Sequence, residues 1–199
     1  MAIKINYSNK VNSKSSSNLV LFTDEKLSIE SLKRYLSSQE FSYISDLQKT
    51  IDLKKNLFVF ELSSKKKIVL ISIKKDLESF DIENLGSEFY ERINYGKNSE
   101  YFVNSDSIIG KYENFISHFL HGFKLKSYEF NKYKTKKETR LISINVLGNK
   151  NKPSIPKQLK FKALEEGIFY ARDLVSEPGN ILHPDEYAKR LNSLRKDGL

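Results

Sequence analysis

The alternation of short apolar runs with helix-like segments limits the fold of this chain more than any other feature of its sequence. Strands are predicted where β-branched, aromatic or alternating apolar residues occur, and helices where apolar residues recur every three or four positions. Strands that alternate with helices along a chain are typical of an α/β domain, which we predict over residues 1–147. The predicted strands cover residues 3–7, 19–22, 57–62, 68–73, 101–103 and 141–147, and the predicted helices 28–44, 82–93 and 114–128.

Two of these runs are the best hairpin candidate in the chain. Residues 57–62 and 68–73 are separated by a five-residue polar segment, SSKKK at 63–67, which suits a hairpin loop. A hairpin joins antiparallel neighbours, whereas strand–helix–strand connections join parallel ones. We therefore expect a mixed sheet flanked by helices.

The segment after residue 147 has a different organisation. GNKNKPSIP at 148–156 carries two prolines and a glycine without apolar periodicity, which predicts a linker. A helix is predicted over 156–176, a stop at EPGN (177–180), and a last helix opening at HPDE (183–186). Because so few helices cannot bury a core of their own, we expect them to need a partner domain that this chain does not contain.

The formal net charge of +9 comes mostly from lysine, since the 34 basic residues comprise 28 Lys and 6 Arg. Arg has the planar guanidinium that suits phosphates and guanine edges, so its scarcity weakens the case for nucleic acid. The basic run KYKTKKETR at 132–140 fits either phosphate contacts or a solvated connection. Nucleic acid therefore stays open as an alternative partner.

Other function classes are excluded by what the sequence lacks. Without cysteine there are no disulfides, thiolate metal sites or cysteine nucleophiles. The apolar runs are far shorter than the roughly 20 residues that cross a bilayer, and the opening MAIKINYSNK is unlike a secretory signal. We expect a soluble, cytoplasmic protein without a membrane partner.

The residues themselves do not mark an active site. His118 and His121 lie at i, i+3 on the predicted phenylalanine-rich helix, but no third ligand accompanies them, so we interpret them as ordinary surface or edge histidines. The closely spaced glycines of a phosphate-binding loop are missing, and so is a G-x-S-x-G elbow. We assign no catalytic, cofactor-binding or metal-binding residue within this chain.

Two segments are more specific than the composition. The first, at 122–135, reads G-x-x-L-x-x-Y-x-F-x-x-Y-K-T, and the second, at 167–184, reads GIFYARDLVSEPGNILHP. Together they resemble the leucyl aminopeptidase (cytosol aminopeptidase) family. Ser176 and Gly179 depart from the family's usual Asn and Ala or Ser. The matching residues are Gly122, Leu125, Tyr128, Phe130, Tyr133, Lys134, Ala171, Arg172, Asp173, Leu174, Pro178, Asn180 and Pro184.

The resemblance implies a macro-like α/β N-terminal domain over residues 1–147, a linker at 148–156, and a truncated start of the catalytic domain at 157–199. It also implies the family's activity, which is the release of N-terminal residues from peptides by two divalent metal ions, Zn or Mn, in a hexameric enzyme. The family's metal-binding stretch N-T-D-A-E-G-R is absent from this sequence.

We therefore expect a chain that is inactive by itself, with the missing catalytic domain or homologous subunits as partners. Arg172 and Asp173 are expected to serve packing or a local ion pair rather than catalysis. The alternative is a nucleic-acid-binding or assembly module without enzymatic activity.

Overall fold

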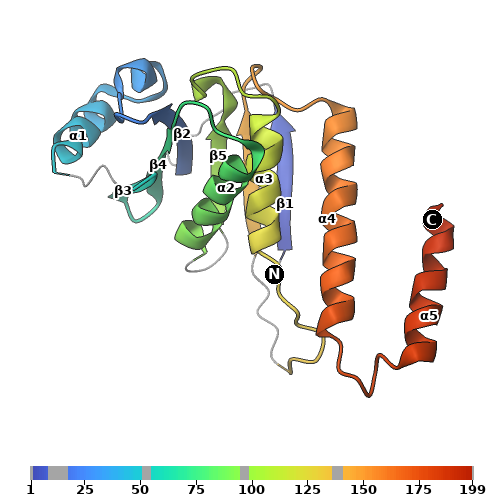
Figure 1. The fold of residues 1–199 in the computed structure, drawn as a ribbon. Helices are drawn as coiled ribbons and strands as arrows, with labels where there is room; N and C mark the ends of the chain where they lie inside the picture. The colour runs from blue at the N-terminus through green and yellow to red at the C-terminus, as the bar shows by residue number, and fades with distance from the viewer. Residues whose placement is uncertain (1, 9–17, 51–54, 95–98, 136–140, 199) are drawn as a thin grey trace.

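The computed structural model describes residues 2–8, 18–50, 55–94, 99–135 and 141–198. Within these ranges the strands form one six-stranded sheet in the order β1-β6-β5-β2-β4-β3, in which β3 alone runs antiparallel to its neighbour (Figure 1). The predicted mixed α/β fold is therefore confirmed. The strands are β1 (Ala2–Ser8), β2 (Asn18–Asp24), β3 (Leu57–Ser63), β4 (Lys66–Ile73), β5 (Ser99–Asn104) and β6 (Leu141–Leu147).

Helices pack on both faces of the sheet, because most of its strands alternate apolar side chains toward each face. On one face α2 (Ser79–Ile93) and α3 (Phe115–Lys126) bury the larger core. On the other face the 3-10 helix η1 (Glu30–Tyr35) and α1 (Ser38–Gln48) bury a smaller core against β2, β4 and β3. The larger core contains a cluster of fully buried rings from β2, α2 and α3, namely Phe22, Phe89, Phe115, Phe119 and Phe123.

Two glycines let the backbones of α2 and α3 touch. A Cβ on Gly86 would lie 1.9 Å from the carbonyl oxygen of Phe119, and a Cβ on Gly122 would lie 1.9 Å from that of Glu83. Both values are far inside van der Waals contact, so no other residue fits at either position without separating the helices. The family-like segment 122–135 thus begins at a packing glycine.

The C-terminal segment stands outside the sheet domain. The long helix α4 (Ile155–Ser176) packs against α3, and α5 (Pro184–Ser193) with the short η3 (Leu194–Asp197) lies on the far side of α4 from the sheet (Figure 1). In α4, which is described throughout, Glu165 is the one buried residue, and the fully described α5 buries none. Neither helix therefore belongs to the core of the sheet domain.

Three predicted boundaries are wrong for local reasons. The helix predicted over 28–44 is broken, because Leu36 is extended and Ser37 forms a capping box with Glu40 that starts α1. The predicted five-residue hairpin loop shortens to Ser64 and Lys65, since the strands extend into it. The helix predicted from residue 156 begins one residue earlier, because α4 starts at Ile155.

The linker is also anchored. Asp106, in the short η2 (Ser105–Ser107) that follows β5, accepts the backbone N–H groups of Asn149 and Lys150 at 2.9 and 2.7 Å through Oδ1. Gly148 has a φ of +112°, a conformation that favours glycine. The connection to α4 is thus tied to the carboxyl end of β5.

Candidate functional site: the joint between the sheet domain and the C-terminal helices

The two family-like segments, 45 residues apart, meet where α3 ends. Arg172 of α4 donates from Nη1 to the carbonyl oxygen of Leu125 at 2.7 Å, and its guanidinium lies 5.5 Å from the ring centre of Tyr128. The hydroxyl of Tyr128 donates to Oδ1 of Asp173 at 2.7 Å. We call this contact between 122–135 and 167–184 the joint. Arg172 and Asp173 thus make local contacts in the joint, and their expected lack of a catalytic role stays a prediction.

Histidines and a buried carboxylate make up the middle of the interface between α3 and α4. The rings of His118 and His121 meet the ring of Phe161 edge to face, at centre distances of 5.0 and 5.4 Å. His118 Nδ1 lies 2.8 Å from a carboxylate oxygen of Glu83, and His121 Nδ1 lies 3.4 Å from one of Glu165. Because its side chain is only 8% exposed, His121 corrects the prediction of two surface or edge histidines.

Glu165 is the centre of this buried polar contact. Its side chain is 6% exposed, and it pairs with Lys124 of α3 at 2.5 Å in addition to His121. Burial, and then the negative charge of Glu165, raises the pKa of Tyr7 on β1 to about 12. The α4 helix is therefore held to the domain mainly by paired polar and aromatic groups.

Glu177, at the C-terminal cap of α4, joins three segments of the chain. Its carboxylate accepts hydrogen bonds from Lys132 and Tyr133, which follow α3, and from Arg190 Nη1 of α5 at 2.8 Å. The bonds from Lys132, Tyr133 and Arg190 lower the pKa of Glu177 to about 2. The Glu177 side chain is 1% exposed, so this network is closed to solvent at its acidic centre.

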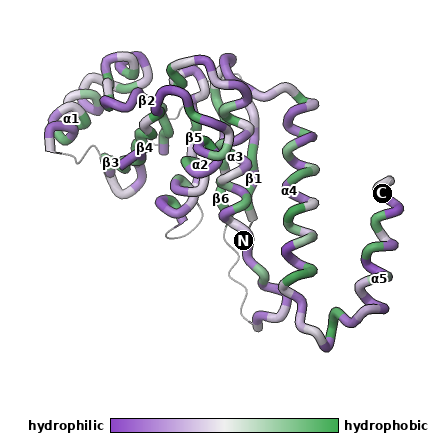
Figure 2. The backbone as a smooth tube through the Cα atoms, in the orientation of Figure 1, coloured by the Kyte–Doolittle hydropathy of each residue, from purple (hydrophilic) through white to green (hydrophobic). Residues whose placement is uncertain are grey.

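The helices α4 and α5 and the turn between them carry exposed apolar residues. Figure 2 shows apolar stretches along both helices. Val175 is 87% exposed and Ile155 71%, which is unusual for such side chains in a folded domain. The exposed apolar residues of this segment are Ile155, Leu159, Leu164, Val175, Ile181, Tyr187 and Leu191.

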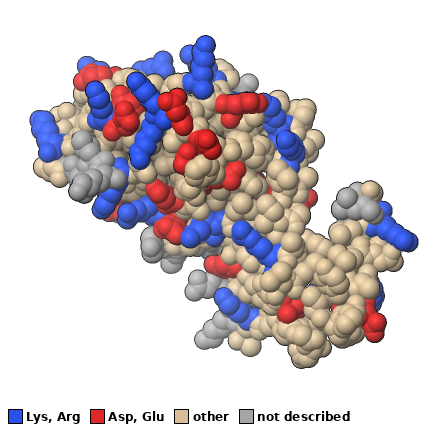
Figure 3. All heavy atoms as spheres, viewed as in Figure 1, with Lys and Arg blue, Asp and Glu red and all other residues tan. Residues whose placement is uncertain are grey.

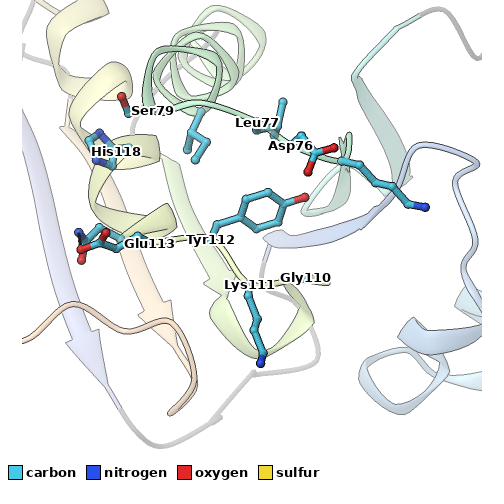
Figure 4. A pocket seen from close by; sticks show the side chains of 11 residues that line it. Asp76, Leu77, Ser79, Gly110, Lys111, Tyr112, Glu113 and His118 are labelled. Atoms are coloured by element: carbon cyan, nitrogen blue, oxygen red, sulfur yellow. Dashed lines mark hydrogen bonds between the residues drawn. The ribbon is translucent and has the colours of Figure 1, made fainter.

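A cavity of about 540 Å³ lies beyond the carboxyl ends of β4 and β5, where ligands often bind in open α/β sheets. Tyr112 bridges its two walls, because its hydroxyl donates to the carbonyl oxygen of Lys74 at 2.6 Å. Figure 4 shows Lys111 extending away from Glu113 and His118. The charged ends do not converge on a common point, so the cavity offers room without a catalytic constellation.

The basic side chains of this protein do not form a separate patch on the visible face but alternate with acidic ones. Figure 3 shows Lys and Arg interspersed with Asp and Glu over the visible face. In the basic run at 132–140, Lys132 and Tyr133 bind Glu177, whereas residues 136–140 lie outside the described ranges. The described start of this run thus has a structural role in the joint.

Comparison with known proteins relates the chain to one class of enzyme, although no protein-family model matches it. A probable cytosol aminopeptidase of Rickettsia typhi is 29% identical over 201 residues, which cover 92% of this chain. The chain is thus a relative of the cytosol aminopeptidases. This confirms the resemblance seen in the two segments of the joint.

Solved structures agree with this relation at the level of the fold. A mutant of tomato leucine aminopeptidase matches 98% of this chain with a TM-score of 0.72 and 19% identity. The bottromycin maturation enzyme BotP, solved in complex with Mn, matches 92% with a TM-score of 0.62 and 10% identity. The sheet and its flanking helices are therefore similar in fold to the matched part of the tomato leucine aminopeptidase.

The chain spans only part of each cytosol aminopeptidase relative. The match covers 40% of the Rickettsia typhi protein and 42% of the tomato chain. Among the residues that the structure describes, no three His, Asp or Glu side chains are grouped to hold a metal ion. Nor does any helix in the described ranges have the length and apolarity to cross a bilayer.

Sequence reasoning missed two groups of the joint. It identified Glu177 only as part of a helix stop, and it did not single out Glu165. Their partners on and just after α3 lie 41 to 45 residues away in the chain, so no local spacing connects them. The one available signal was the pair of family-like segments, whose shared match implied that they belong together.

Proposed function

We propose that the chain is the N-terminal portion of a metal-dependent leucyl aminopeptidase and that its own role is to carry and position the catalytic portion. The parent activity is the release of N-terminal amino acids from peptides with two divalent ions, Zn or Mn, in a cytoplasmic hexamer. We divide the chain into an N-terminal macro-like domain at 1–147, a linker at 148–156 and the start of the catalytic domain at 157–199. The relation to cytosol aminopeptidases along 92% of the chain supports this proposal.

The single observation that carries the positioning role is the two-sided character of α4. Toward α3 it presents Phe161, the paired Glu165 and the bonded Arg172. Away from α3 it exposes Leu159 at 61%, and near its C-terminal end Val175 is 87% exposed. A helix that is apolar on its outer side is stable in water only when another surface covers that side. We propose the catalytic portion of the enzyme as this cover.

The residues present do not fit the two-metal site itself. In the family, Asp, Glu and Lys side chains hold the metals, but the described acidic residues of this chain are not grouped to bind an ion. Several are instead occupied as ion-pair partners, as Glu165 and Glu177 are. We therefore derive no catalytic step for this chain and propose that it is inactive alone.

Reconstitution tests the proposal. The chain is mixed with the separately expressed remainder of the Rickettsia typhi relative, with Mn²⁺ or Zn²⁺ present, and the hydrolysis of a leucyl amide is measured. We expect no hydrolysis from the chain alone and faster hydrolysis from the mixture than from the remainder alone. Hydrolysis by the chain alone contradicts the proposal. So does a rate of hydrolysis by the remainder that is the same with and without the chain.

A matched pair of variants tests the surface. Leu159→Glu places a charge on the outer apolar side of α4, whereas Lys160→Glu changes an exposed lysine beside it. We expect the first to abolish the stimulation and the second to preserve it. Equal effects of the two variants would show that this face of α4 does not bind the catalytic portion.

Nucleic-acid binding and enzyme-free assembly are the alternatives that the sequence left open. In the described part of the basic run, Lys132 is bonded to Glu177, so this part gives nucleic-acid binding no specific support. Retention on DNA at low salt that falls steeply as salt rises would favour the nucleic-acid alternative.

A further inference from the structure

The position of α5 is not fixed by buried apolar side chains. None of its residues, all of which are described, is buried. Its side-chain and backbone hydrogen bonds to earlier described segments come from Arg190, whose Nη1 donates to Glu177 at 2.8 Å and whose backbone carbonyl accepts a hydrogen bond from the hydroxyl of Tyr170 at 2.9 Å. The position of α5 therefore depends on polar contacts made by Arg190.

Glu177 extends this contact to the sheet domain. Lys132 and Tyr133, on the connection that leaves α3, donate to the same carboxylate that binds Arg190. Within α5, Glu186 holds the guanidinium from its other side, with Oε1 3.0 Å from Nε of Arg190. A single carboxylate thus receives donors from the domain and from α5 at once.

We infer that Glu177 is an ionic lock that fixes α5 relative to the sheet domain in the chain as it stands, before any further domain binds. Three donors around a side chain that is 1% exposed satisfy the acceptor positions of the carboxylate with charge-assisted bonds. These bonds cross from residues 132 and 133 to 177 and on to 190, so they restrain segments that no shared apolar core holds together. The lock is a property of this chain and does not rest on the proposed aminopeptidase role.

The lock has a consequence for any partner that binds the exposed apolar residues of α4 and α5. With α5 fixed, the exposed apolar residues Val175 on α4 and Tyr187 and Leu191 on α5 keep a constant relative position. Holding a binding surface in place beforehand removes ordering costs that would otherwise weaken association. This consequence alone rests on the proposed function.

A distance measurement between α4 and α5 tests the lock directly. Because the chain has no cysteine, Lys160→Cys and Asn192→Cys introduce two unique sites for spin labels on exposed positions of the two helices. Pulsed electron resonance then gives the distribution of label distances in the otherwise unaltered chain. We expect a single narrow distribution.

Glu177→Gln is then introduced with Glu166→Gln as its matched control, since Glu166 is a 68% exposed glutamate of the same helix that pairs with Lys162. We expect Glu177→Gln to broaden the distribution and to speed amide exchange in α5 by about tenfold or more, while exchange in the sheet stays unchanged. Glu166→Gln should match the parent. Unchanged sheet exchange separates release of α5 from loss of folding.

Two results would overturn the inference. One is a distribution for Glu177→Gln as narrow as that of the parent. The other is equal broadening by Glu166→Gln, which would make α5 sensitive to charge anywhere on α4. Neither result bears on aminopeptidase activity, so the lock and the proposed function can fail separately.

Discussion

Replacing Gly122 with alanine tests the backbone contact on which the packing of α2 and α3 depends. The new Cβ would lie 1.9 Å from the carbonyl oxygen of Glu83 and 2.5 Å from its carbonyl carbon. Backbone atoms cannot rotate away as a flexible side chain can, so the two helices must separate by about 1 Å or more to relieve the overlap. That separation loosens the contact between Phe89 and the rings of α3.

The expected magnitude is the difference between two opposing terms. Overpacking a core costs about 1–3 kcal/mol, and contact with rigid backbone places this site at the upper end of that range. Alanine is better than glycine in a helix by about 1 kcal/mol, which offsets part of the cost. The net loss in free energy of unfolding is about 2 kcal/mol. For a chain of this size, that loss lowers Tm by about 4–8 °C.

Gly167→Ala is the matched control. Gly167 lies inside α4, and a Cβ there would meet no heavy atom within 4 Å. Only the helix propensity changes, so this variant should gain about 0.5–1 kcal/mol of stability. Thermal unfolding followed by circular dichroism compares both variants with the parent. A Tm for Gly122→Ala equal to or above the parent value refutes the reasoning.

Two further predictions concern the joint. Arg172→Ala removes the bond to the carbonyl of Leu125 and the cover over Tyr128, and it should cost about 1 kcal/mol in urea unfolding, whereas the exposed Lys160→Ala should change stability by less than about 0.5 kcal/mol. Because its pKa is lowered to about 2, the Glu177 carboxylate holds α5 in place fully above about pH 4.5, and we expect this stabilisation to be lost as the pH falls toward about 2. The distribution of label distances should then broaden in the parent. It should not broaden further in Glu177→Gln, in which it is already broad.

The sequence predicted the elements of the fold well because each strand and helix carries its own periodicity. The alternation of Ile142, Ile144 and Val146 identified β6, and the four-residue spacing of Phe115, Phe119 and Phe123 identified the buried side of α3. These patterns exist because one side of each element must be buried. They are therefore readable without knowing the neighbours.

Prediction failed where local chemistry or a distant partner overrode the pattern. The apolar spacing over 28–44 suggested one helix, but the capping box at Ser37 and Glu40 satisfies the first N–H groups of a new helix and starts α1 there. His121 has no sequence feature that distinguishes it from a surface histidine. It is buried because Phe161 and Glu165 of α4 cover it.

The sequence by itself indicated a mixed α/β domain followed by helices too few to bury a core of their own, and two short segments connected it to the cytosol aminopeptidases. Only the tertiary structure decided that these two segments touch, and that Glu177 holds Lys132, Tyr133 and Arg190 together. The physical reason is that periodicity is a property of neighbouring residues, whereas an ion pair depends on the position of two side chains in space. Residues 45 positions apart acquire that position only when α4 packs along α3.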